Sequence, residues 1–135
     1  RRIKATDFFT GLFSTSLQEG EIIVSVRVPI PADGAKTSYQ KFEQPASRFA
    51  IVGCAVMRTP DGKTNIAFTG VSSRAFRDPG AEAEVSGKPL NNESIEAAAN
   101  AAVRNVQVLS DNFASEEYRR HVAKVYLKKA LEAVM

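Results

Sequence analysis

The sequence has 135 residues, 44% of them hydrophobic and 24% charged, with a formal net charge of +3. This length and apolar content predict one globular domain and exclude a disordered chain. No apolar run approaches the roughly 20 residues that span a bilayer, no signal peptide is recognisable, and Cys54 is the only cysteine, so we expect a cytoplasmic protein without a disulfide framework. Positive and negative side chains are interleaved near the C-terminal end, which is typical of a solvated helix face and not of a nucleic-acid-binding surface.

The first residues, Arg1 to Lys4, include no initiator methionine and lead directly into an apolar cluster, so we expect the chain to be a fragment of a longer protein. In this cluster, DFFTGLF, Asp7 can cap a short helical turn that Gly11 ends. Exposure of so many aromatic side chains would be unfavourable. We therefore expect the cluster to pack on a sheet or on a neighbour outside the chain.

Residues 21–28, EIIVSVRV, alternate between apolar and polar side chains and predict a β-strand. Ile23 breaks the alternation, because it is apolar but lies on the polar face. It is either covered by a neighbouring side chain or part of a small apolar floor for a docked molecule. The expected core face carries Ile22, Val24, Val26 and Val28.

Residues 37–56, TSYQKFEQPASRFAIVGCAV, predict two strands joined by a polar loop. The first strand alternates, with Tyr39 and Lys41 on one face. The second, residues 51–56, is apolar or small on both faces, as in a strand buried on both sides. The loop from Glu43 to Phe49 is placed to contact a ligand or a partner, and an ordinary hairpin loop is the simpler alternative.

Residues 65–72 alternate again and predict a fourth strand, in which Gly70 indicates a bulge or a close backbone approach. The short connections between these strands favour an antiparallel meander. Three helices are then predicted. Their start signals are Asp78 followed by Pro79, then Asn92, then Ser115.

The second predicted helix carries a continuous apolar stripe from Ile95 to Val106. On the third helix Arg119 falls within the apolar arc, so it needs a polar partner, for which Asp111 is a candidate. The predicted fold class is α+β, a small antiparallel β-sheet of three or four strands followed by a three-helix bundle.

No catalytic or metal-binding arrangement is recognisable in the sequence. His121 and Cys54 are single and far apart, no nucleophile elbow occurs, and neighbouring carboxylates diverge on the predicted helices. There is also no glycine-rich phosphate loop. We therefore expect neither catalytic residues nor metal ligands in this chain.

Several segments resemble the C-terminal domain of the FAD-binding medium subunit of molybdenum hydroxylases. This group includes the carbon monoxide dehydrogenase medium subunit and the xanthine dehydrogenase FAD-binding subunit. The similarity runs nearly end to end, so it implies that residues 1–135 form this domain and that the domains binding the FAD phosphates lie upstream. The matching segments are DFFTGLF, EGEIIVSVRVPIP, YQKF, SRFAIVGCAV, IAFTGVSSRAFR and LSDNFASEEYRRHVAKVYLKKAL, and the most specific stretches are EYRRHVAKV and PGAEAEVSGKPL.

The resemblance implies part of an oxidoreductase subunit that helps to enclose FAD, which relays electrons from iron–sulfur clusters to an acceptor. It places the flavin-contacting residues at Ile23 and Lys41 and the loop from Glu43 to Phe49 near the flavin ring. The implied partners are the upstream FAD-binding domains, a large subunit with the molybdenum cofactor and a small iron–sulfur subunit. By itself the domain is expected to be inactive. A non-catalytic protein–protein interaction module remains the alternative.

Overall fold

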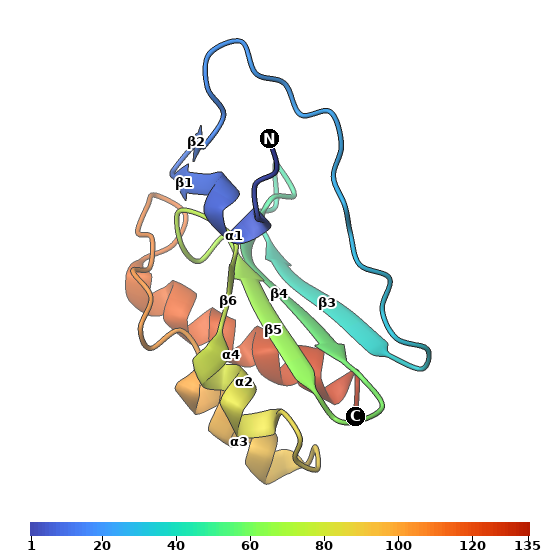
Figure 1. The fold of residues 1–135 in the computed structure, drawn as a ribbon. Helices are drawn as coiled ribbons and strands as arrows, with labels where there is room; N and C mark the ends of the chain where they lie inside the picture. Colours follow the sequence, from blue (N-terminus) through green and yellow to red (C-terminus); the bar gives the residue numbers. More distant parts are fainter.

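A computed structural model describes all residues from 1 to 135. Its centre is a four-stranded antiparallel sheet with the strand order β3-β4-β5-β6, covered on one face by helices (Figure 1). The strands are β3 (Lys36–Glu43), β4 (Ala50–Arg58), β5 (Thr64–Thr69) and β6 (Phe76–Arg77). The covering helices are α2 (Pro79–Val85), α3 (Asn92–Ala101) and α4 (Glu116–Glu132). The α+β class is thereby confirmed. The helices form a layer in which α4 packs on β3 and β4, while α2 packs on α3 and β5.

The two faces of the sheet differ because side chains alternate along each strand. The helix-covered face is largely apolar, and its buried side chains include Val52, Cys54, Val56, Ile66 and Phe68, with Thr64 as a buried polar exception. The opposite face, which we call the open face, carries no helix. The predicted alternation of residues 37–42 is confirmed, whereas the predicted burial of residues 51–56 on both sides is wrong at Ala55, which is exposed on the open face.

Two of the three predicted helix caps, Asp78 and Ser115, are confirmed. Asp78 caps α2 through Ala81 N–H, and its other carboxylate oxygen accepts a 2.7 Å hydrogen bond from Val103 N–H. The second helix is capped by Asn91 and not by Asn92. It also ends earlier than the apolar stripe predicted, because the chain turns after Ala101 and Val103 adopts a φ of 53°.

Helix α4 begins after the predicted cap Ser115 and brings Arg119 into the core with only 4% of its surface exposed. The Arg119 guanidinium donates to Asp111 at 2.6 Å, as predicted, and also to the carbonyls of Ile51 and Gly70, both at 2.7 Å. The close backbone approach predicted at Gly70 is confirmed. A Cβ there would lie 2.5 Å from the Ala50 carbonyl oxygen, and the φ of 76° favours glycine.

The N-terminal part differs from the prediction. A single helical turn, α1 (Ala5–Phe8), precedes a short hairpin of β1 (Phe9–Gly11) and β2 (Ser14–Thr15), so Asp7 lies inside the turn and does not cap it. The Phe9 carbonyl accepts a 2.6 Å hydrogen bond from Arg74, which connects this hairpin to the rest of the molecule.

The strand predicted over residues 21–28 is absent. These residues follow an extended path from the hairpin to β3, beside the sheet and without joining it (Figure 1). A strand requires hydrogen bonds from a neighbouring strand, and nothing in this chain supplies them here. The fourth strand of the sheet is instead the short β6, which the sequence analysis did not identify. None of the helices combines the length and apolar character needed to cross a membrane.

Candidate functional site

The turn between β3 and β4 places two positively charged side chains around one carboxylate. The Lys41 ammonium lies 3.1 Å from one oxygen of Glu43, and the Arg48 guanidinium lies 2.9 Å from the other. These contacts lower the pKa of Glu43, chiefly through its hydrogen bond with Lys41. The group therefore carries one negative and two positive charges at neutral pH, so one positive charge remains to face an anionic ligand.

The backbone of the same turn is held in a defined shape. Lys41 donates a 2.9 Å hydrogen bond to the Arg48 carbonyl, which connects the strand to the far end of the loop. Gln44 stabilises the loop, because its side-chain oxygen accepts hydrogen bonds from both the backbone N–H and the hydroxyl group of Ser47. Arg48 has a φ of 61°, a conformation that non-glycine residues adopt rarely and that recurs at ligand-binding turns. The next residue, Phe49, exposes 80% of its surface.

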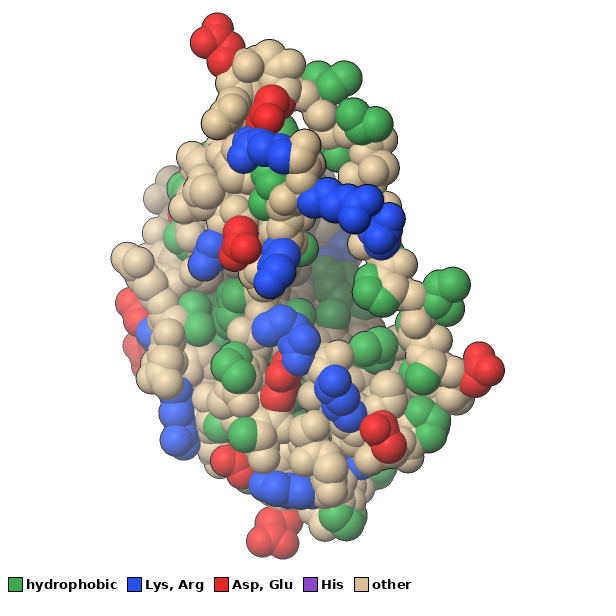
Figure 2. Space-filling view, viewed as in Figure 1, with side chains coloured by type: hydrophobic (Ala, Val, Ile, Leu, Met, Phe, Trp, Pro, Cys, Tyr) green, Lys and Arg blue, Asp and Glu red, His purple; other side chains and the backbone are tan.

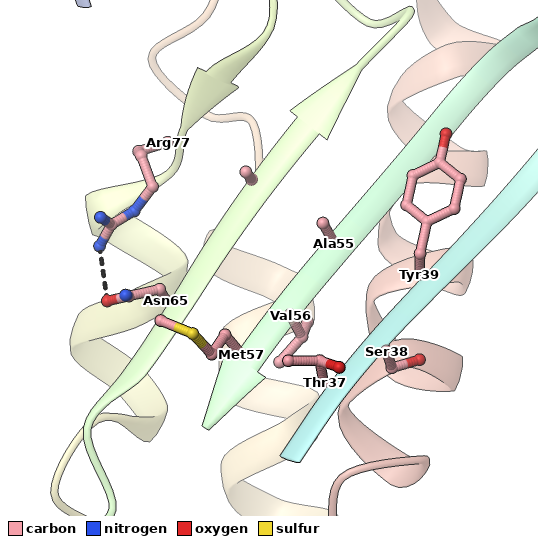
Figure 3. Close-up of a pocket in the computed structure, with 9 residues that line it drawn as sticks. Thr37, Ser38, Tyr39, Ala55, Val56, Met57, Asn65 and Arg77 are labelled. Carbon is pink, nitrogen blue, oxygen red and sulfur yellow. Dashed lines mark hydrogen bonds between the residues drawn. The ribbon is translucent and has the colours of Figure 1, made fainter. Parts of the chain in front are cut away.

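The open face of the sheet contains a shallow hollow of about 340 Å³, lined by the first residues of β3 and the last residues of β4, away from this turn (Figure 3). Its middle is lined by the small residues Ala55 and Ala67, which lie opposite each other on β4 and β5. Tyr39 borders it on the β3 side, and Arg77, which donates a 2.9 Å hydrogen bond to Asn65, borders it on the β6 side. The full lining is Thr37, Ser38, Tyr39, Ala55, Val56, Met57, Asn65, Ala67 and Arg77.

A glycine keeps this face flat between the hollow and the Lys41 group. Gly53 lies opposite Lys41 in the register, and the Tyr39 side chain extends over it. An added Cβ at Gly53 would lie 2.5 Å from the Tyr39 hydroxyl oxygen and 2.7 Å from the Thr69 methyl group. The sequence analysis missed this contact, although a glycine inside a strand signals a close approach.

The structure places the two predicted flavin-contacting residues in different surroundings. Lys41 lies in the charged group on β3, on the open face as its alternation predicted. Ile23 lies on the extended segment with 55% of its surface exposed and outside the hydrophobic core. This chain alone does not bring the two side chains together in one formed site.

Other reactive side chains lie away from this region. Cys54 is fully buried on the helix-covered face, and burial, aided by the charge of Asp78, raises the pKa of its thiol to about 12, so the thiolate needed for nucleophilic chemistry is disfavoured. His121 is exposed on α4. No three histidine, cysteine, aspartate or glutamate side chains are grouped as metal ligands.

Comparisons with known proteins give a consistent result. The sequence model described as the CO dehydrogenase flavoprotein C-terminal domain matches residues 37–134. The carbon monoxide dehydrogenase medium chain of Hydrogenophaga pseudoflava is 34% identical over 98% of this chain and 48% of its own length. The glyceraldehyde dehydrogenase medium chain of Sulfolobus acidocaldarius is also 34% identical, over 99% of this chain and 49% of its own length.

The fold is similar to that of solved structures in the same group. One is a carbon monoxide dehydrogenase from Hydrogenophaga pseudoflava that lacks the Mo-pyranopterin moiety of the molybdenum cofactor, which superimposes with a TM-score of 0.86 at 34% identity. The match covers 96% of this chain and 46% of that chain. The present chain thus spans about half the length of the relatives that it matches.

Proposed function

Because this chain belongs to the CO dehydrogenase flavoprotein C-terminal domain family, we propose that it is the C-terminal part of a FAD-binding medium subunit of a molybdenum hydroxylase. In this role it helps to enclose the flavin that other parts of the subunit bind. The observation that carries the proposal is the family match from β3 to the end of α4, which includes the turn with Lys41 and Arg48.

Within this proposal, the side chains at this turn lie near the edge of the flavin ring of FAD and not near the FAD phosphates. The chain has no glycine-rich loop whose amides could cradle a pyrophosphate, so the phosphates are assigned to the upstream domains. Lys41 offers a cation on the open face, and Ile23 offers exposed apolar surface. When bound, FAD supplies the electron carrier between iron–sulfur clusters and a final acceptor.

Within this proposal, Lys41 and Ile23 have different tasks. Glu43 neutralises only part of the positive charge of Lys41 and Arg48, so Lys41 stabilises added negative charge nearby. Its hydrogen bond to the Arg48 carbonyl also fixes the loop against the strand. Ile23 excludes water from the surface that it covers, because its side chain offers no hydrogen-bonding group.

The partners and the location belong to the same proposal. The molybdenum cofactor and the iron–sulfur clusters are assigned to a large and a small partner subunit, as the membership of this family implies. A cytoplasmic location is included on the basis of the sequence composition. The similarity to carbon monoxide dehydrogenase and glyceraldehyde dehydrogenase medium chains supports an oxidoreductase complex, in which substrate is chosen by the large subunit.

The test uses the complete subunit in its complex. Lys41→Met should lower the flavin reduction potential or the FAD content, because a cation near the ring favours the reduced, anionic flavin. Ile23→Ser should reduce FAD retention with a smaller effect on potential. Potentiometric titration and the ratio of flavin to protein after gel filtration measure both effects.

Lys36→Met is the matched control, because Lys36 is an exposed lysine on the same strand that contacts the Met135 carbonyl far from the turn. It should leave flavin content and potential unchanged. Wild-type flavin content, potential and turnover in both Lys41→Met and Ile23→Ser would remove these two residues from the proposal.

A further inference from the structure

A second hollow lies in the helix layer, between the end of α3 and the middle of α4. Its volume is about 560 Å³, and we call it the α3–α4 hollow. Three cationic side chains line it and no acidic one does. Arg104 follows the end of α3, while Arg120 and Lys124 lie one turn apart on α4. The full lining is Asn100, Ala102, Val103, Arg104, Arg120 and Lys124. The hollow therefore concentrates positive charge outside the elements that carry Lys41 and Ile23.

The backbone that forms the floor of this hollow is held in a fixed shape. Val103 has a φ of 53°, which is unusual for a β-branched residue. It is held from two sides, because its N–H donates to Asp78 at 2.7 Å and its carbonyl accepts from the Arg120 guanidinium. The same guanidinium donates to the Val106 carbonyl at 3.0 Å. A strained residue persists only where its surroundings fix it, so the floor of the hollow is formed before any ligand arrives.

The two arginines of the hollow differ in how far their donors are used. Besides its two backbone contacts, Arg120 donates from Nε to Glu116 at 2.9 Å, so its charge is offset and its role is to support the floor. Arg104 donates only from Nε, at 2.8 Å, to the Asn100 carbonyl at the end of α3, where a cation is favourable. The terminal nitrogens of Arg104 make no hydrogen bond within the chain. They are therefore free to donate to a ligand.

Lys124 is the member of the hollow that a helix-end contact does not explain. It lies within α4, is half-buried, and makes no hydrogen bond or ion pair. Its neighbours one turn away on the same helix are Arg120 and Lys128, and like charges at this spacing repel each other. The Lys128 ammonium is paired with Glu96 and not with anything at Lys124. An anion between Lys124 and Arg104 would remove this repulsion.

The chemistry of the hollow favours a small ligand over a docked protein. Its apolar members, Ala102 and Val103, are buried, so it offers no large apolar or aromatic anchor of the kind that protein interfaces use. Exposed apolar side chains lie elsewhere. The even-numbered residues from Ile22 to Ile30 form such a row, seen along the right edge of Figure 2, where Figure 1 places this segment. The free guanidinium fork of Arg104 instead matches the oxygens of a phosphate group.

We propose that the α3–α4 hollow binds a small phosphate-bearing anion, which the terminal nitrogens of Arg104 and the ammonium of Lys124 hold over the floor that Arg120 supports. The hollow is of the size usual for small-molecule sites, so it has room for an organic group beside the phosphate. The bound anion connects the end of α3 to α4. The site shares no residue with the flavin proposal and does not depend on it.

Calorimetric titration of the complete subunit with inorganic pyrophosphate, at constant ionic strength, tests the inference. The subunit carries its FAD, so pyrophosphate cannot occupy the place of the FAD phosphates. We expect saturable binding with a dissociation constant of about 1 mM or tighter. The double variant Arg104→Met, Lys124→Met should bind at least about tenfold more weakly, because it loses the charged donors. Lys129→Met is the matched control, since it removes one charge from the same helix outside the hollow, and it should keep the wild-type affinity.

Three results would overturn the inference. The first is the absence of saturable pyrophosphate binding to the wild-type subunit. The second is a wild-type dissociation constant in the double variant, or an equal weakening by Lys129→Met, which would assign the binding to net charge and not to the hollow. The third is binding of polyglutamate without binding of pyrophosphate, which would assign the hollow to an acidic protein segment. Failure of the flavin proposal appears separately, as a purified subunit without flavin absorbance before the titration.

Discussion

Arg119 is the residue on which three parts of the molecule converge. Its guanidinium contacts the carbonyl of Ile51 in β4, that of Gly70 after β5, and the carboxylate of Asp111 in the loop before α4. Burial tends to raise the pKa of Asp111, but the amides of Phe113 and Ala114 together with Arg119 outweigh it and the pKa is lowered. The stabilisation from this carboxylate is therefore present above its ordinary pKa and is lost as the pH falls below it.

Arg119→Met should destabilise the chain by about 2–4 kcal/mol, because the carbonyls of Ile51 and Gly70 each lose a charged hydrogen-bond donor in or near the core. Urea unfolding followed by circular dichroism measures the change.

Lys128→Met is the control on the same helix. Lys128 forms an ion pair with Glu96 in which both side chains are partly exposed, so its loss should cost no more than about 1 kcal/mol. Equal losses of unfolding free energy in Arg119→Met and Lys128→Met would show that the buried contacts of Arg119 do not stabilise the fold more than an exposed ion pair does.

At the scale of elements, α4 covers the sheet and completes the core. Its inward side chains include Val122, Ala123, Leu127, Ala130 and Leu131, and it packs on β3, β4 and α3. The helix also brings Tyr126 and Tyr118 against Phe42 of β3, with ring centroids 5.9 Å apart in both pairs. The apolar side chains of the sheet and those of α4 therefore bury each other.

Leu127→Asp should unfold or disperse the chain, because Leu127 is fully buried and an unpaired carboxylate there costs several kcal/mol, or about the whole stability of a small domain. Thermal melting and analytical gel filtration measure the outcome.

His121→Asp places the same charge on the exposed face of the same helix and should leave melting nearly unchanged. A wild-type melting temperature and elution volume for Leu127→Asp would mean that this face of α4 does not form the core.

Short sequence patterns correctly predicted the elements that are determined by residues close together in the sequence. The caps at Asp78 and Ser115, the hairpin of β3 and β4 and the burial of Arg119 all follow from short-range patterns. The strand expected over residues 21–28 was wrong for this chain, since alternation reports a buried face but cannot supply a pairing partner. The two-residue β6 has no recognisable pattern because it is defined only by its pairing with β5.

The candidate site was predictable to a similar extent. The loop from Glu43 to Phe49 was identified from its position between two strands, and Lys41 from the resemblance to a family. The grouping of Lys41 and Arg48 around Glu43 depends on the loop geometry, which sequence spacing does not reveal. The position of Ile23 relative to Lys41 depends on residues outside this chain and stays a prediction.

At the scale of the whole molecule, the proposal that the upstream half binds the FAD phosphates can be tested directly. The 135-residue chain alone should not retain FAD, because its exposed turn supplies charge but no phosphate-binding loop. Titration with FAD, followed by quenching of flavin fluorescence, should show no saturable binding.

A dissociation constant of about 10 μM or tighter would contradict this expectation, since it corresponds to roughly 7 kcal/mol of binding free energy from this half alone. The complete subunit, titrated in parallel after removal of its flavin, is the positive control.

The position of α4 after all the other elements has a consequence for biosynthesis. The ribosome releases β3 to β6, α2 and α3 first, so the part of the apolar face that α4 covers on β3 and β4, with Phe42 and Val52, stays exposed until α4 emerges. A polypeptide terminated before Ser115 would carry this surface permanently and become a substrate for chaperones and proteases. Premature stop codons in this last stretch should therefore act by removing the protein from the cell, even though they spare Lys41 and the turn beside it.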